Sequence, residues 1–130
     1  MRITIVNTIV NTIETCTVSY TIHNNNQPSA SNRRQAVGNI LSNAGFAPTG
    51  NQTAYKKTPC DAKCCEAIAR SLAEVMAHGD FLLVEYTNSH SMAWTLKTFV
   101  DAGSSEHKAI VNKIDEIGSE NVILIEPGKP

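Results

Sequence analysis

The chain has 130 residues, of which 42% are hydrophobic and 18% charged, with a formal net charge of −1 at pH 7. This length suffices for one hydrophobic core, so we expect a single domain over 1–130. The near-neutral charge excludes a strongly basic nucleic-acid-binding domain, so any phosphate-binding surface must be local. The sequence contains no run of about 18 apolar residues, which argues against a membrane span. We therefore expect a soluble, cytoplasmic protein.

The chain begins with two segments that favour strands. Residues 2–14 are rich in isoleucine, valine and threonine and contain Ile-Val-Asn-Thr-Ile twice, so we predict a strand arm there. Residues 17–22 alternate polar with apolar side chains, which is typical of a strand with one buried face. A polar run with three consecutive asparagines ends this second strand.

A capped amphipathic helix follows the polar run. Asn32 is placed to cap it, with a glutamine three residues later as in a capping box. One apolar stripe recurs at helical spacing: Val37, Ile40, Leu41 and Ala44. Gly45 can adopt the left-handed conformation that ends a helix, and Phe46 can fold back onto the last turn. We then predict a turn over 47–51, which could hide one short strand, and a strand over 52–57.

A second helix is predicted to begin at Thr58. Pro59 would occupy its first helical position and Asp61 its first turn, where a negative charge suits the helix dipole. The apolar positions at helical spacing predict the buried face: Cys65, Ile68, Ala69, Leu72 and Met76. Gly79 is expected to end this helix.

The C-terminal region predicts strands, one further helix and a last strand. Residues 81–86 are the most apolar segment and therefore predict a central strand. The segment 92–100 fits both strand and helix spacing, and the polar turn before it favours a strand. A helix is predicted over 105–117 and a final strand over 121–126.

This order of elements predicts an α+β sandwich built on one sheet. Residues 16–87 match a split βαβ, ferredoxin-like core. The arm at 2–14 precedes this core, and 90–126 adds a C-terminal strand-helix-strand extension. Short sheets of this kind leave strand edges that are prone to pairing, so we expect a homodimer.

The four cysteines are the first candidates for chemistry: Cys16, Cys60, Cys64 and Cys65. Adjacent Cys64 and Cys65 are poorly placed to bridge, so we predict reduced thiols, with no metal and no cofactor. Helical spacing places Cys60 and Cys64 on one edge and turns Cys65 into the core. Metal or redox use is the alternative, and a helix N-terminus lowers a thiol's pKa, which makes Cys60 the most reactive candidate.

Four basic side chains are the second candidates. Arg33 and Arg34 stand at the start of the first helix, and Lys56 and Lys57 at the end of the following strand. Such a group could bind the phosphates of RNA or DNA. Solvated charges at element ends are the alternative. The sequence has no glycine-rich phosphate loop.

The same stretch resembles a family. Four segments carry the resemblance: Val18-Ser-Tyr-Thr-Ile22, Arg33-Arg34, Ala44-Gly45-Phe46 and Gln52-Thr-Ala-Tyr55. They are similar to the motifs of small ferredoxin-fold endonucleases, which include the CRISPR-associated adaptation subunit and the VapD-type toxin ribonucleases. The resemblance covers about residues 16–87 and implies a ferredoxin-like dimer that associates with nucleic acid.

The resemblance fails at the metal position. The family's metal-binding aspartate falls on Thr21, and its serine falls on Thr53. A threonine hydroxyl is a poor ligand for a hard divalent cation, so the metal site is predicted to be degenerate. We predict a dimeric nucleic-acid-associated protein without catalysis. If the chain is an enzyme, the resemblance implies a metal-dependent endoribonuclease. The alternative is a protein–protein interaction module such as a small regulator or inhibitor.

Overall fold

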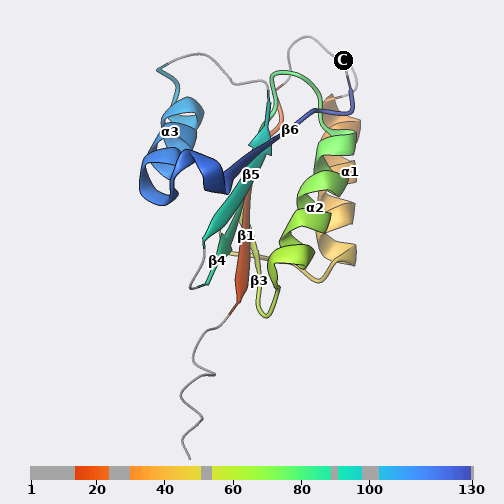
Figure 1. The fold of residues 1–130 in the computed structure, drawn as a ribbon. Coiled ribbons are helices and arrows are strands. Elements are labelled where there is room, and N and C mark those ends of the chain that lie inside the picture. Colours follow the sequence, from red (N-terminus) through yellow and green to blue (C-terminus); the bar gives the residue numbers. More distant parts are fainter. Residues whose placement is uncertain (1–13, 24–29, 51–53, 89–90, 98–102, 130) are drawn as a thin grey trace, which may run out of the picture.

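A six-stranded mixed sheet carries helices on both faces (Figure 1). The computed structural model describes residues 14–23, 30–50, 54–88, 91–97 and 103–129. The α+β class is confirmed, whereas the strand arm predicted over 2–14 lies almost wholly outside the described residues. Helices α1 (Ala30–Asn43) and α2 (Ala62–Val75) cover one face, and α3 (Ser105–Ile117) lies on the other.

The strands follow the order β2-β3-β1-β4-β5-β6 across the sheet. Their bounds are β1 (Thr15–Thr21), β2 (Ala47–Pro48), β3 (Ala54–Lys57), β4 (Phe81–Thr87), β5 (Met92–Leu96) and β6 (Val122–Ile125). Neighbouring strands are antiparallel except for the parallel pair of β5 and β6. The short strand at 47–48 and the strand within 92–100 are confirmed, and a 3-10 turn, η2 (Ser119–Asn121), precedes β6.

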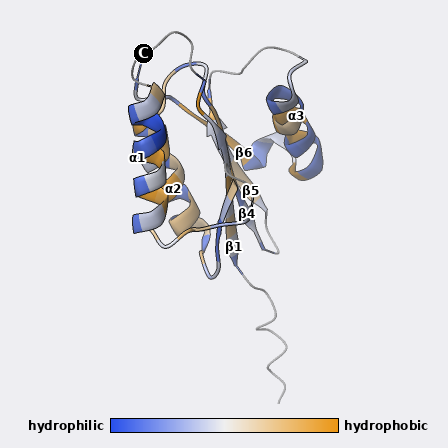
Figure 2. Ribbon diagram, turned by 180° about the vertical axis from the view of Figure 1, so that it is seen from behind, coloured by the Kyte–Doolittle hydropathy of each residue, from blue (hydrophilic) through white to orange (hydrophobic). Residues whose placement is uncertain are grey.

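The main core lies between the sheet and the α1/α2 pair. β1 alternates as its sequence predicts, with Cys16, Val18 and Tyr20 buried against the helices and threonine or serine on the opposite face. β4 is buried on both faces, because α3 covers the other side of this strand with Ile110. Figure 2, coloured by residue hydropathy, shows hydrophobic segments of the α1 and α2 ribbons on the side that faces the sheet. No described helix is long and apolar enough to cross a membrane.

The ends of α1 show which local signals decide a helix. Gly45 has a φ of 87°, and the N–H of Phe46 donates to the carbonyl of Leu41 at 3.0 Å, as in a Schellman motif. That predicted end is confirmed. The predicted start at Asn32 is wrong, because the helix begins at Ala30. Ala30 and Arg33 are both buried, so tertiary contacts fix the first turn.

The start of α2 also differs from the prediction. The helix begins at Ala62, not Thr58, and Asp61 is its N-cap, with its carboxylate accepting from the N–H of Cys64 at 2.8 Å. This side chain satisfies an amide that would otherwise lack a helical partner. The preceding residue is held outside the helix, because the N–H of Cys60 donates to the carbonyl of Glu14 at 2.9 Å.

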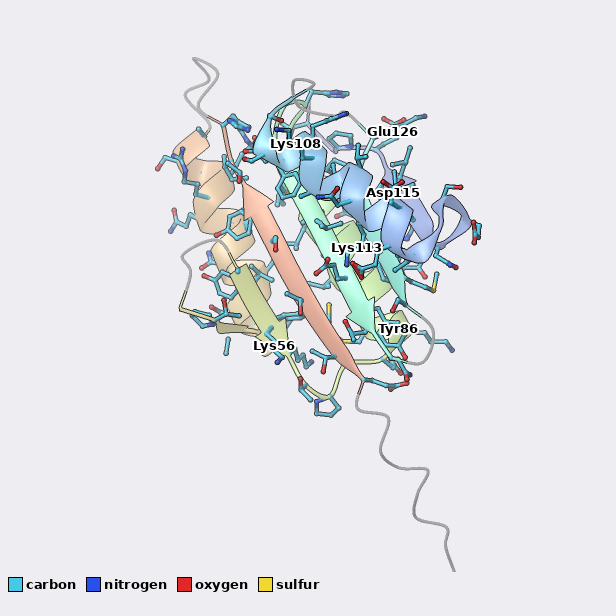
Figure 3. The ribbon with its side chains drawn as sticks, turned by 90° about the vertical axis from the view of Figure 1, so that its left-hand side faces the viewer. Lys56, Tyr86, Lys108, Lys113, Asp115 and Glu126 are labelled. Atoms are coloured by element: carbon cyan, nitrogen blue, oxygen red, sulfur yellow. A yellow bond between two sulfur atoms is a disulfide. The ribbon has the colours of Figure 1, made fainter. Side chains whose placement is uncertain are left out.

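The predicted helix over 105–117 is confirmed with both of its ends. Ser104 caps it by accepting from the N–H of His107, and Gly118 follows it with a φ of 90°. An ion pair at 2.8 Å between Lys113 and Glu85 of β4 ties this helix to the sheet (Figure 3).

Candidate redox-active cysteine site

All four cysteines lie together at one end of the sheet. Cys16 extends from β1, Cys60 stands just before the N-cap of α2, and Cys64 and Cys65 lie in its first turn. Cys60 and Cys64 form a disulfide with their Cα atoms 5.5 Å apart, whereas Cys16 and Cys65 are buried free thiols. The prediction of reduced thiols is therefore wrong for two of the four cysteines.

The disulfide and the free thiols share one site. The sulfur of Cys65 lies 3.9 Å from that of Cys60, and the sulfurs of Cys16, Cys60 and Cys65 all lie within 4.8 Å of one another. A disulfide bond is about 2.05 Å long, so Cys65 needs to approach Cys60 by only about 2 Å to exchange with it.

The true start of α2 explains how the bridge forms. Residues four apart inside a helix have Cβ atoms about 5–6 Å apart, which is wider than the roughly 3.8 Å of a disulfide. Because Cys60 stands before the N-cap, its backbone is not restricted to helical geometry, and its Cα lies 5.5 Å from that of Cys64, which allows the bridge. The prediction that Cys60 lies on the edge of the helix is wrong. A Cys60 inside the helix would be too far from Cys64 to form the disulfide, so the prediction does not include it. The spacing Cys-Asp-x-x-Cys, with the aspartate as N-cap, is the signal that could have found it.

The cysteines differ in their surroundings. Cys16 is fully buried, and its hydrogen bond with Cys65 together with burial raises the pKa of its thiol well above the ordinary value. Cys64 is only partly buried and occupies the third helical position of α2. A helix N-terminus stabilises a thiolate at such a position.

An open groove of about 460 Å³ lies beside Cys64, between α1, α2 and the end of β3. Its lining is mostly apolar and consists of Ile40, Asn43, Ala44, Phe46, Lys57, Cys64, Ala67, Ile68 and Ser71. Lys57 places its ammonium 6.0 Å from the centre of the Phe46 ring. Cys64 is the cysteine that lines this groove, so an external thiol would meet its sulfur before the buried ones.

Arg33 is predicted to lie on a phosphate-binding surface, but it is buried in an ion pair. The Arg33 side chain is 4% exposed, and its Nε lies 3.0 Å from Oδ2 of the fully buried Asp80. Asp80 also accepts from the N–H groups of His23 and Ala77. This pair joins the end of β1, α1 and the turn before β4, and it compensates the charge of Arg33 inside the fold.

The other basic residues point in different directions. Arg34 is exposed and donates to the carbonyl of Ile22 at 3.3 Å. Lys56 and Lys57 are successive residues of β3, so they extend from opposite faces of the sheet. Lys57 lies at the groove and Lys56 on the opposite face (Figure 3). The structure therefore does not gather the four predicted cations on one surface.

In the described part of the chain, Thr21 at the predicted metal position has no cluster of metal-ligating side chains around it. Thr21 ends β1, pairs with Phe81 and is partly exposed, while Thr53 lies outside the described residues. Among the described residues, the group of His, Cys, Asp and Glu side chains close enough to share an ion is the trio of cysteines.

No family model, curated protein or solved structure matches this chain.

Proposed function

We propose that this is a thiol–disulfide redox protein, in which the Cys60–Cys64 disulfide is reversibly reduced and re-formed. The observation that carries the proposal is the free thiol of Cys65, 3.9 Å from the sulfur of Cys60. A disulfide that only staples the fold has no need of a neighbouring thiol, whereas exchange requires a thiol within reach of a disulfide sulfur.

The groove defines the order of the steps. An external thiolate attacks the sulfur of Cys64, the bond to Cys60 breaks, and Cys60 leaves as a thiolate that takes a proton. A second external thiol then attacks the outer sulfur of the mixed disulfide and releases Cys64. The protein gains two electrons and two protons, and the two external thiols leave as a disulfide. The reverse sequence oxidises a partner dithiol.

Cys65 supplies an internal route through the same site. Its sulfur can attack Cys60 and expel Cys64 as a thiolate into the groove, with the disulfide moving to Cys60 and Cys65. The start of α2 favours Cys64 as the leaving sulfur, because the helix dipole stabilises its negative charge. A better leaving thiolate makes the exchange faster.

The test is to trap the mixed disulfide. Cys60→Ser leaves Cys64 at the groove without its partner, so incubation with oxidised glutathione should attach one glutathione to Cys64, read by intact mass and peptide mapping. The matched variant Cys64→Ser leaves only buried cysteines and should react much more slowly. Equal labelling of the two variants, or no labelling of Cys60→Ser, would contradict the proposal.

We also propose that residues 16–87 form a ferredoxin-like unit. Support comes from the order β2-β3-β1-β4 with antiparallel neighbours and two helices on one face, which is the split βαβ arrangement. The elements β5, α3 and β6 form the C-terminal extension. The edge strand β6 carries an exposed Leu124 and could pair with a second copy to form a homodimer. Equilibrium sedimentation tests this homodimer.

Nucleic-acid association remains a second candidate. It is favoured by the polar face of β1 and β3, which carries Lys56 and has no helix over it in Figure 3. Binding of short RNA or DNA in gel shifts should weaken steeply with salt and be reduced by Lys56→Glu. An absence of salt-dependent binding would favour the protein-interaction alternative. Thermal melting of Thr21→Asp with and without manganese tests whether the family's metal site can be restored.

A further inference from the structure

We propose that the reduced protein binds one soft, thiophilic metal ion between Cys16, Cys60 and Cys65. This inference rests on the proposed function, because Cys60 can be a ligand only after its disulfide with Cys64 is reduced. The ion belongs to the class that prefers sulfur, such as Zn²⁺ or Cu⁺.

The sulfur spacing already matches a metal-bound arrangement. With metal–sulfur bonds of about 2.3 Å, two thiolates on a tetrahedral ion lie about 3.8 Å apart. The sulfurs of Cys60 and Cys65 are 3.9 Å apart, and Cys16 completes a group within 4.8 Å. Small rotations of the side chains are therefore enough to close the site around an ion.

The three ligands are held by different elements of the core. Cys16 lies on β1, which is paired on both sides, and Cys65 lies in the first turn of α2. Cys60 is fixed through its N–H, which donates to the carbonyl of Glu14. All three side chains are buried, with exposed fractions of 0%, 3% and 0% for Cys16, Cys60 and Cys65. Such support positions ligands before binding.

The donor set decides the class of ion. All three donors are sulfur, and among the residues that the structure describes neither a carboxylate nor an imidazole belongs to the group. Thiolates favour Zn²⁺ and Cu⁺, whereas Mg²⁺ and Ca²⁺ prefer oxygen. The thiols must lose their protons when the ion binds, so loading releases protons to solvent.

Disulfide formation and metal binding exclude each other at Cys60. A disulfide oxidant such as oxidised glutathione accepts two electrons from the thiolates of Cys60 and Cys64, which then bond. The metal ion leaves with its charge unchanged, because Cys16 and Cys65 alone hold it too weakly. The cluster is thus a site in which oxidation releases the ion.

The experiment compares the full-length protein in two redox states. Protein reduced with a phosphine and kept under nitrogen is titrated with Co²⁺ as a spectroscopic probe, and then with Zn²⁺ and Cu⁺ in competition. We expect one equivalent of Co²⁺ with thiolate-to-cobalt charge-transfer absorption. The disulfide form should bind at least about 100-fold more weakly, since losing even a second-shell partner costs 10–100-fold.

Variants identify the ligands. Cys65→Ala and Cys16→Ala should lose at least about 100-fold in affinity. The matched control Cys64→Ala cannot form the Cys60–Cys64 disulfide and should keep the affinity of the reduced wild type. Circular dichroism reports whether each variant is folded. The comparison of oxidised with reduced wild type needs no variant, so it decides the question even if Cys16→Ala does not fold.

Two results overturn the metal site. One is a reduced wild type that binds none of the three ions, and the other is a Cys64→Ala loss as large as that of Cys65→Ala. A protein that exchanges its disulfide but binds no metal loses only this inference. A protein that binds metal through the three cysteines but never forms the disulfide loses the proposed function instead.

Discussion

The two ends of β1 both bury groups that could do chemistry, but the groups are held in different ways. At the end near His23, Asp80 accepts hydrogen bonds from Arg33 and from two backbone N–H groups. At the opposite end, near Cys16, two sulfurs are bonded and two remain thiols within 4.8 Å of Cys60. The Arg33–Asp80 pair has its opposite charges in contact, whereas the cysteine cluster keeps two free thiols beside its disulfide.

This difference separates a structural cluster from a candidate functional one. A buried charge that is paired and hydrogen-bonded to backbone leaves nothing free to react, and breaking it leaves an uncompensated charge. In the proposed function, by contrast, the sulfurs exchange partners while the fold is kept. Four experiments can break or sharpen this comparison.

The largest effect is expected at the Arg33–Asp80 pair. Asp80→Ala leaves the Arg33 charge buried without its partner and should lower the free energy of unfolding by about 3–5 kcal/mol, measured by urea denaturation. Glu66→Ala is the matched control, because it breaks an exposed helical ion pair with Arg70 that contributes about 0.3–0.5 kcal/mol. Similar losses in the two variants would mean that Arg33 is not structural.

The next largest effect is expected at Cys65. In reduced protein, Cys65→Ser places a hydroxyl in a buried apolar site and should cost about 1–3 kcal/mol of unfolding free energy. The same substitution at partly buried Cys64 should change it by less than about 0.5 kcal/mol. Equal losses would show that the two sulfurs have similar environments, contrary to the structure.

Reducing the disulfide should have a smaller effect than breaking the ion pair. The bridge spans only four positions of sequence, and the chain-entropy model gives no more than about 2 kcal/mol for so short a loop. Thermal and urea unfolding with and without a phosphine measure the loss, and Cys64→Ser should show no further loss on reduction. Unfolding on reduction would make the disulfide a structural staple.

The smallest effect concerns the pH dependence of stability. The raised pKa of Cys16 keeps its thiol neutral in the folded protein, while the unfolded chain ionises above the ordinary value of 9.0. Ionisation of Cys16 in the unfolded chain therefore does not lower the free energy of unfolding well below pH 9. It lowers this free energy as the pH rises through 9, by roughly 0.8 kcal/mol at pH 9.5. Cys16→Ala should remove this part of the pH dependence, and an unchanged profile would contradict it.

The parts of the fold that the sequence predicts are those decided by local signals. The alternation in β1, the Gly45 end of α1 and the range of α3 depend on residues a few positions apart. Period and capping chemistry are visible over that distance. The start of α2 shows the limit, because Pro59 predicts an earlier start than the one set by Asp61, whose carboxylate accepts a hydrogen bond from the N–H of Cys64.

The candidate site depends on distances that the sequence does not show. Arg33 and Asp80 are 47 positions apart, so the sequence does not show that Arg33 is paired inside the fold. Cys16 reaches Cys65 only because β1 lies beneath the first turn of α2. The sequence shows that three cysteines lie close together near Cys60. A helix that begins at Thr58 nevertheless predicts the wrong geometry for them, because α2 begins at Ala62.

The central claim is that the Cys60–Cys64 disulfide changes state, and its reduction potential tests this most directly. The protein is equilibrated in glutathione buffers of defined ratio, quenched with an alkylating reagent and read by mass spectrometry. We expect one two-electron transition involving Cys60 and Cys64, with a potential above about −300 mV because a free thiol and an open groove adjoin the bond. A potential below about −300 mV, as structural disulfides have, or four free thiols at every ratio, would contradict the account.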